Sequence, residues 1–155
     1  MLIYDRTQED VDRAREYAEI GYKNLSPSQR DEWDNGLKGC YTIFDLNRVA
    51  LEMERISRIF NDAGYENVID VRSDWVFDDI LTKSDIDDYL DNVEILRRAF
   101  FVLLTTPETP INIKPYTYAN DIEKILFDII SLYQNNLNEK LFLGEKSAGE
   151  RIGIA

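Results

Sequence analysis

The sequence contains no histidine and only one cysteine, Cys40, among its 155 residues. A single cysteine cannot form a disulfide within the chain, and the common zinc sites need histidine or several cysteines. A carboxylate-bridged two-metal bundle also needs histidine, in Glu-x-x-His pairs. We therefore expect a fold held together by packing, with no metal and no cofactor.

Basic residues are also scarce, because 18 Lys and Arg stand against 30 Asp and Glu, a net charge of −12 at pH 7. Nucleic-acid binding and docking on anionic lipid both need a basic surface, so this charge disfavours both kinds of partner. The longest apolar run, residues 99–104, is far shorter than the roughly 20 residues of a membrane span. Residues 1–6 lack the regions of a signal peptide, which favours synthesis in the cytosol.

The chain nevertheless has ample material for one hydrophobic core. Hydrophobic residues make up 44% of it, outside the range that keeps acidic chains disordered, and its length fits one domain. Apolar residues recur at helical spacing in successive segments. The sequence predicts a mainly α fold, a small antiparallel helical bundle over residues 1–140, followed by a short extended hairpin or arm over residues 141–155. The expected helices cover residues 7–25, 26–34, 42–63, 84–104 and 116–138.

Capping residues indicate where these helices begin. Thr7, Thr42 and Ser84 each precede an aspartate three residues on, which is the spacing of a capping box. Ser26-Pro27 is a further helix start, because proline suits the first helical position. Residues 65–83 break the helical pattern, and we expect short extended pieces or one helical turn there.

The acidic residues are concentrated in one segment. Residues 65–92 hold nine acids and two bases, so −7 of the net charge belongs to them. The run of residues 85–88 lacks the glycine and the alternating acids of a calcium loop, and acids are favoured in the first turn of a helix. We expect this patch to face a basic partner surface or solvent, not a metal. The candidate contact patch consists of Asp78, Asp79, Asp85, Asp87 and Asp88.

The usual nucleophile motifs are missing from the sequence. Cys40 has no histidine to raise its thiolate fraction, no Gly-x-Ser-x-Gly elbow is present, and the isolated glycines form no phosphate-binding loop. General acid–base chemistry by two carboxylates stays an alternative, because spacing in the sequence does not fix pairing in space. We expect no catalytic residues and no enzymatic activity.

Polar residues on two otherwise apolar helices indicate a structural network. Arg48 follows Asp45 by three residues, and Asn120 and Glu123 begin the last helix. In one interpretation these residues form exposed pairs worth about a few tenths of a kcal/mol. In the other, Arg48 forks onto Glu123 across the bundle while Asn47 or Asn120 satisfies backbone groups at helix ends. Both interpretations favour a structural role over a ligand site.

Three motifs in register give the sequence a family resemblance. Residues 5–11 read Asp-Arg-Thr-Gln-Glu-Asp-Val, residues 38–49 end in Asp-Leu-Asn-Arg-Val, and residues 119–123 read Ala-Asn-Asp-Ile-Glu. The chain thereby resembles a family of small proteins encoded in the tail region of phages and prophages of Gram-positive bacteria, a module also found in larger minor tail proteins. It departs from that family at Thr42, where the family has Asn. Further shared positions are Trp75, Tyr89–Val93, Thr109-Pro110 and Gly144-Glu145, although the Tyr-Ser-Gly step expected before Gly144 is absent.

The resemblance implies a non-enzymatic virion component, in or near the tail or baseplate, that acts through protein–protein contacts. Its expected partners are other virion or tail proteins, with residues 141–155 as a candidate arm for homo-oligomer formation. We expect it to be made in the bacterial host cytoplasm and carried in the virion, without contacting nucleic acid or membrane. The alternative is an acidic protein that mimics nucleic acid and fills the basic groove of a host defence protein. That role needs carboxylates spaced along one surface like phosphates, whereas the acids here concentrate in one segment.

Overall fold

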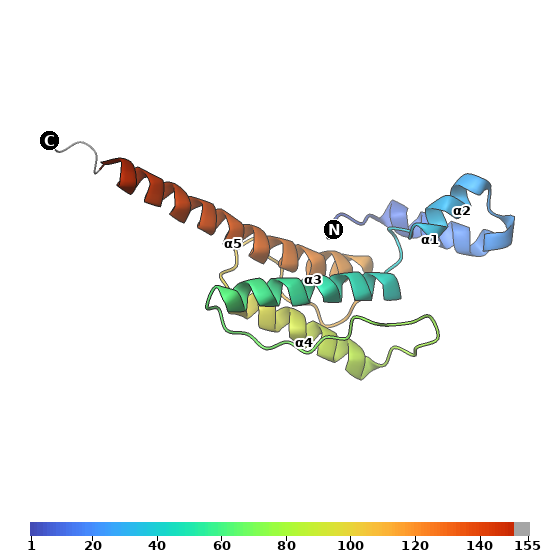
Figure 1. Ribbon diagram of the computed structural model, residues 1–155. Coiled ribbons are helices and arrows are strands. Elements are labelled where there is room, and N and C mark those ends of the chain that lie inside the picture. The colour runs from blue at the N-terminus through green and yellow to red at the C-terminus, as the bar shows by residue number, and fades with distance from the viewer. Residues whose placement is uncertain (151–155) are drawn as a thin grey trace.

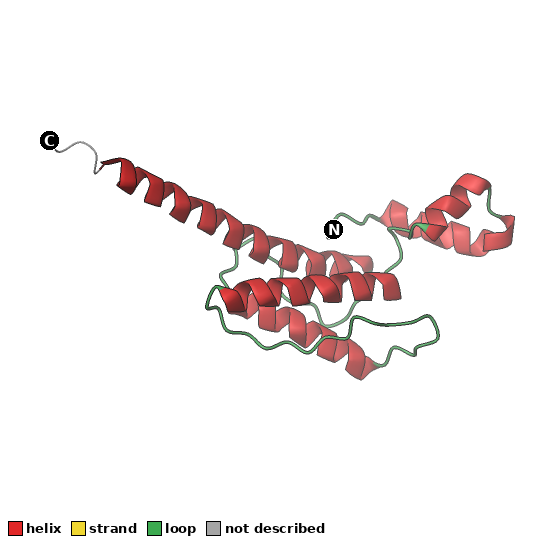
Figure 2. Ribbon diagram, viewed as in Figure 1, coloured by secondary structure: helices red, strands yellow, loops and turns green. Residues whose placement is uncertain are grey.

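The computed structural model describes residues 1–150, with side chains described through residue 141. Within that part of the chain every regular element is helical and there is no strand (Figure 2). The expected mainly α fold is therefore confirmed. In chain order the elements are α1 (Gln8–Ile20), the 3₁₀ turn η1 (Tyr22–Asn24), α2 (Pro27–Asp34), α3 (Ile43–Asp62), α4 (Lys83–Ala99) and α5 (Tyr116–Glu150).

Capping boxes set the starts of the first three α-helices, as the sequence predicts for Thr7 and Thr42. Thr7, Ser26 and Thr42 each share reciprocal hydrogen bonds with the residue three positions on. In each box the two side chains satisfy backbone N–H groups that the first helical turn leaves without partners. The local sequence is therefore sufficient to position these three helix starts.

The predicted start of α4 at Ser84 is wrong by two residues. Thr82 is the capping residue, and its backbone N–H and hydroxyl donate to Asp85 at 2.8 and 2.5 Å. The sequence offers a threonine or serine with an aspartate three residues on in both registers, so spacing alone could not choose between them. Asp87 instead pairs with Lys83 one turn away, at 2.5 Å.

Helices α3, α4 and α5 form a bundle around the main core (Figure 1). Each turns one apolar stripe inward, at the 3.6-residue spacing that the sequence shows. Burying each large side chain is worth about 1.5–3 kcal/mol, so this core supplies most of the driving force for folding. The residues with 0% exposure are Val49, Ala50, Met53, Ile56 and Phe60 of α3, Val93 and Leu96 of α4, and Ala119, Ile122, Glu123, Ile125, Leu126 and Ile129 of α5.

The expected antiparallel arrangement is wrong, because α3, α4 and α5 run in the same direction (Figure 1). The N-terminal turns of α3 and α5 meet where Arg48 bonds Glu123, and the C-terminal ends of α3 and α4 meet where Phe60 contacts Phe100. Antiparallel neighbours need short loops. Here residues 63–82 and 100–115 are long enough to return along the bundle, since extended chain covers about 3.3 Å per residue and the 20-residue α3 is about 30 Å long.

Helix α4 ends at Ala99, not near Leu104 as expected. Phe100 is extended, with φ −135° and ψ 179°, and it is buried. Its ring lies 5.4 Å from that of Phe60 and 5.6 Å from that of Tyr133. Packing of Phe100 into this aromatic cluster pulls the chain out of the helix, and Leu104 is left fully exposed.

The connection from α3 to α4 has no regular structure over residues 65–82. The helical turn that was one expectation for this segment is absent, and the extended pieces that were the other have no neighbouring strand. Side-chain amides take the place of a strand partner. Asn92 accepts from the Asp70 N–H and donates to the Asp70 carbonyl, both at 2.9 Å. Asn47 does the same for Trp75, both at 2.8 Å. These bonds hold the connection against α3 and α4 without a sheet.

Helices α1 and α2 form a lobe with a small core of its own (Figure 1). Its buried residues are Ala14, Tyr17, Leu25 and Leu37. At Gly39 the backbone of the segment before α3 passes close to the first turn of α1. A Cβ added to Gly39 would lie 2.0 Å from the Asp10 carbonyl oxygen. Only glycine fits between the segment that leads to α3 and the first turn of α1.

The expected extended tail over residues 141–155 is wrong as far as the structure describes it, because α5 continues to Glu150 and crosses the expected boundary at residue 140. No proline follows Pro115, and the segment is rich in Leu, Glu, Lys and Ala, which favour helix. An isolated glycine costs a running helix only about 1 kcal/mol, so Gly144 does not end it. Residues 151–155 lie outside the described part of the chain.

Candidate functional site

Four charged side chains meet where the N-terminal segment, α3 and α5 come together. We call Arg6, Asp45, Arg48 and Glu123 the ion cluster. Glu123 lies at its centre with 0% exposure, and Arg6 is 4% exposed. The helical starts at Thr42 and Tyr116 bring Asp45, Arg48 and Glu123 to the same end of the bundle, and Arg6 precedes the capping residue of α1.

Arg48 makes the forked contact with Glu123, one of the two arrangements that the sequence left open. Its Nη1 donates to Glu123 Oε2 at 2.7 Å, and its Nη2 donates to Glu123 Oε1 and Asp45 Oδ1, both at 2.8 Å. Burial alone would lower the pKa of Arg48, but hydrogen bonds to the two carboxylates outweigh it and raise this pKa above its usual value. Arg48 is therefore held as a cation across the bundle.

Arg6 is the member that sequence reasoning missed. Its Nη2 donates to Glu123 Oε1 at 2.8 Å, its Nε to the Lys38 carbonyl at 3.1 Å, and its Nη1 to the Ile3 carbonyl at 2.5 Å. The guanidinium also lies over the Tyr41 ring, 5.2 Å from the centroid. The only signal in the sequence was its place in the Asp-Arg-Thr motif, because nothing local shows that an N-terminal arginine is buried.

The two asparagines of the predicted network serve different segments. Asn120 accepts from the Arg6 N–H at 3.0 Å and donates to the Arg6 carbonyl at 2.9 Å. It thus fixes the backbone of the segment that carries Arg6. Asn47 precedes Arg48 in α3, and neighbouring residues of a helix point about 100° apart. Asn47 therefore lies outside the ion cluster and donates to the Trp75 carbonyl. The structure therefore brings Asp45, Arg48, Asn120 and Glu123 together and leaves Asn47 apart.

A pair of tyrosines lies beside the ion cluster. The Tyr41 and Tyr89 hydroxyls are 2.8 Å apart, joining the segment before α3 to α4. Burial raises the pKa of both hydroxyls well above the usual value, so both stay protonated at neutral pH. This pair was not predicted, because the two residues are 48 positions apart in the chain.

The ion cluster is balanced in charge and saturated in hydrogen bonds. Two guanidinium groups face two carboxylates, and Glu123 Oε2 also accepts from the Ile3 N–H at 2.5 Å. In the part of the chain with described side chains, every buried side-chain nitrogen or oxygen has a hydrogen-bond partner. No polar atom in the cluster is left aimed at a ligand. The arrangement thus serves to clamp the N-terminal segment, α3 and α5 together.

The candidate contact patch is divided between different surfaces. Asp85 and Asp88 are on one face of α4, three residues apart, and line a depression beside Arg72. Asp87 points to another face. Asp79 accepts from Arg72 at 2.6 Å, whereas Asp78 is exposed in the loop.

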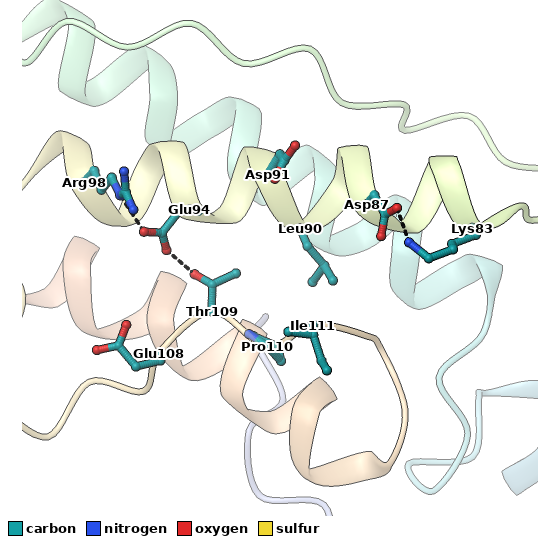
Figure 3. Close-up of a pocket in the computed structure, with 10 residues that line it drawn as sticks. All are labelled: Lys83, Asp87, Leu90, Asp91, Glu94, Arg98, Glu108, Thr109, Pro110 and Ile111. Carbon is teal, nitrogen blue, oxygen red and sulfur yellow. Dashed lines mark hydrogen bonds and ion pairs between the residues drawn. The ribbon is translucent and has the colours of Figure 1, made fainter.

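A second cleft lies between α4 and the residues that precede α5 (Figure 3). Two of the acids that line it are paired there: Asp87 with Lys83, and Glu94 with both Arg98 and Thr109, each at 2.5 Å. Burial alone would raise the pKa of Glu94, but hydrogen bonds from Thr109 and Arg98 outweigh it and lower this pKa. The Thr109–Glu94 hydrogen bond holds the connection against α4, and the lowered pKa keeps the Glu94 carboxylate ionised at neutral pH.

Cys40 is half-buried, and burial raises the pKa of its thiol, which keeps it a poor nucleophile. Among the described residues no three or more Cys, Asp or Glu gather in a way that could hold a metal ion. None of the described helices combines the length and apolar character needed to cross a membrane. Comparison of the chain with protein-family models, curated proteins and solved structures gave no match.

Proposed function

We propose that this protein is a non-enzymatic structural module of a phage or prophage virion, associated with the tail or baseplate and acting through contacts with other virion proteins. The observation that carries the proposal is the meeting of all three resemblance motifs in the ion cluster. Arg6 comes from residues 5–11, Asp45 and Arg48 from residues 38–49, and Glu123 from residues 119–123. The residues that define the resemblance thus build one junction of the fold.

Other motif residues also have folding roles. Thr7 and Asp10 form the capping box of α1, Gly39 allows the close approach to α1, and Asn120 bonds the backbone of Arg6. A family related by reaction would be expected to share residues around a pocket with groups free to react. Residues shared for packing and capping instead support a family related by architecture, as a structural module would be.

The surface supports a role in protein–protein contact. The exposed acids of the contact patch, Asp78 and Asp88, offer a partner of opposite charge an electrostatic guide to docking. The large apolar side chain of Phe77, which precedes Asp78, is 89% exposed as well. Exposed apolar groups next to charge are typical of surfaces that bind other proteins.

The proposal is tested by affinity capture of the tagged chain from host cells in which the encoding phage or prophage is induced, with captured proteins identified by mass spectrometry. We expect tail or baseplate proteins to be recovered. The variant Arg6→Ala, which weakens the fold, is the matched control and should recover less. Recovery of a nuclease or another host defence protein in place of tail proteins would contradict the proposal and favour the nucleic-acid mimic.

A further inference from the structure

An open apolar pocket lies between the α1–α2 lobe, the first turn of α3 and the loop that connects α3 to α4 (Figure 1). We call it the interlobe pocket; its volume is about 630 Å³. All three parts contribute to its lining, with Trp33 and Leu37 from the lobe, Ile43 and Phe44 from α3, and Phe77 from the loop. This size and lining are typical of a site that accepts large apolar side chains.

Exposed apolar side chains accompany the interlobe pocket. Phe44 and Phe77 line it and are nevertheless 74% and 89% exposed. Val76 and Ile80, on the same loop as Phe77, are 58% and 84% exposed. Large apolar side chains that stay in water beside an apolar pocket are typical of a surface that binds another protein, and aromatic residues contribute most to such binding.

Two of the three parts that bound the interlobe pocket are acidic. Helix α2 has one arginine and three acids, a net charge of −2, and the loop belongs to residues 65–92, which carry −7. Among the described residues that line the pocket, Asp34 is an acid and none is a lysine or an arginine. Asp34 accepts from the neutral Tyr22 hydroxyl at 2.9 Å, so its charge is kept, and the exposed Asp78 follows Phe77.

The bases nearest to the pocket along the chain are engaged by other acids. Lys38, between α2 and α3, lies 3.0 Å from Asp5 and 3.7 Å from Asp10. Arg72, in the loop, bonds Asp79 at 2.6 Å. The mouth of the pocket therefore has a negative potential that these bases do not cancel.

We propose that the interlobe pocket docks a basic segment of a partner protein. One large apolar side chain of that segment is inserted beside Phe44 and Phe77, and flanking Lys or Arg side chains face Asp34 and Asp78. The apolar lining selects the inserted side chain, and the acidic mouth selects the charge around it. A second copy is disfavoured as the occupant, because a chain with a net charge of −12 repels its own kind. The inference rests on the proposed virion function and names the chemistry of the partner.

Selection from a display library of random-sequence peptides tests the chemistry of the occupant. The library is selected in parallel on the purified full chain and on its Phe77→Ser variant, which keeps the fold because Phe77 is exposed. We expect the peptides that bind only the unchanged chain to combine a Phe, Leu or Trp with neighbouring Lys or Arg. Peptides that are acidic or uncharged, or an absence of peptides that depend on Phe77, overturn the proposal.

The affinity of the most enriched peptide, measured by fluorescence anisotropy, locates its contact. The double variant Asp34→Asn with Asp78→Asn should bind it about 2- to 30-fold more weakly at low salt, the range for two exposed ion pairs. Added salt should weaken its binding to the unchanged chain more than to this variant. The matched control is Asp62→Asn with Glu66→Gln, which removes two exposed acids at the other end of α3 and should bind normally. Equal weakening in both double variants would contradict docking at the pocket.

Light scattering of the purified chain and of Phe77→Ser tests the second copy as the occupant. We expect the substitution to leave the molar mass in solution unchanged. Association of the unchanged chain that Phe77→Ser abolishes would assign the pocket to a second copy and overturn the proposal. These experiments judge the pocket alone, whereas the proteins captured from induced cells judge the virion role, so the failure of one is distinguished from the failure of the other.

Discussion

Arg6 and Glu123 show what the ion cluster does for the fold at the scale of single residues. Their side chains are 1% and 0% exposed, so both charges have left water. Desolvation costs several kcal/mol per ion, and only close pairing with further hydrogen bonds offsets it. Arg6 has carbonyl, carboxylate and aromatic partners, and Glu123 has two guanidinium groups. Removing Arg6 leaves the buried Glu123 with one guanidinium in place of two and takes the donor from the Ile3 and Lys38 carbonyls.

We predict that Arg6→Ala lowers the free energy of unfolding by about 3–5 kcal/mol, the range for breaking a buried ion pair from one side. Urea denaturation of the two proteins measures the difference. Arg13→Ala is the control, because the Arg13–Glu32 pair is 51% and 41% exposed and should change the free energy little. Equal effects of the two substitutions would show that the ion cluster contributes no more than a surface pair.

We predict that the Asp85 cap makes stability depend on pH. Hydrogen bonds from the Thr82 side chain and backbone lower the pKa of Asp85 below its usual value of 3.8. The carboxylate therefore stabilises the fold above the usual pKa, and this stability is lost as pH falls through the lowered one. Asp85→Asn should lower the melting temperature at pH 7 and make less difference at pH 3. A difference that grows on acidification would contradict this assignment.

The residue-scale contacts were only partly predictable from the sequence. The pairing of Arg48 with Glu123 was one of two interpretations that the sequence left open, since an isolated charge on a buried face needs a partner but an exposed one does not. The burial of Arg6 and the Tyr41–Tyr89 bond could not be predicted, since both depend on how distant segments are placed by the packed helices. Charge and periodicity indicate which residues need partners but not which distant residue supplies them.

At the scale of elements, helix starts were easier to predict than helix ends or directions. The capping boxes at Thr7 and Thr42 are local, and the sequence shows them directly. The end of α4 depends on Phe100 entering an aromatic cluster with Phe60 and Tyr133, which is a tertiary contact. The parallel course of α3, α4 and α5 depends on long connections between the helices. Amide side chains fix the paths of these connections, and the connections show no helical or strand periodicity in the sequence.

The docking of α1 against the segment before α3 gives a prediction at this scale. Gly39→Ala should destabilise the protein by about 1–3 kcal/mol, because the added Cβ would lie 2.0 Å from the Asp10 carbonyl oxygen and the lobe must shift. Hydrogen exchange should show lost protection in α1 and α2, with α3 and α5 little changed. The control is Gly36→Ala, where no atom lies within 4 Å of the added Cβ and only the backbone at φ +89° is strained. Uniform loss of protection in all helices would contradict a separately docked lobe.

At the scale of the whole molecule, the part of α5 with described side chains leaves the core after Tyr133. The core ends near Tyr133, and residues 137–141 are exposed. We predict that a chain ending at Asn138 keeps the free energy of unfolding of the full chain, because the first residues removed, Glu139 to Leu141, are exposed. Chemical denaturation measures this. A marked loss of stability would show that residues 139–155 contribute to the fold.

The central claim is that this chain is a structural part of a virion, and its most direct test is its copy number in purified particles. Particles from induced host cells, separated by density gradient and measured by quantitative mass spectrometry, should contain the chain in a fixed ratio to the other tail proteins. A ratio that matches the rotational symmetry of a tail ring would be the expected result. Particles without the chain, with all of it in the particle-free fraction, would contradict the account.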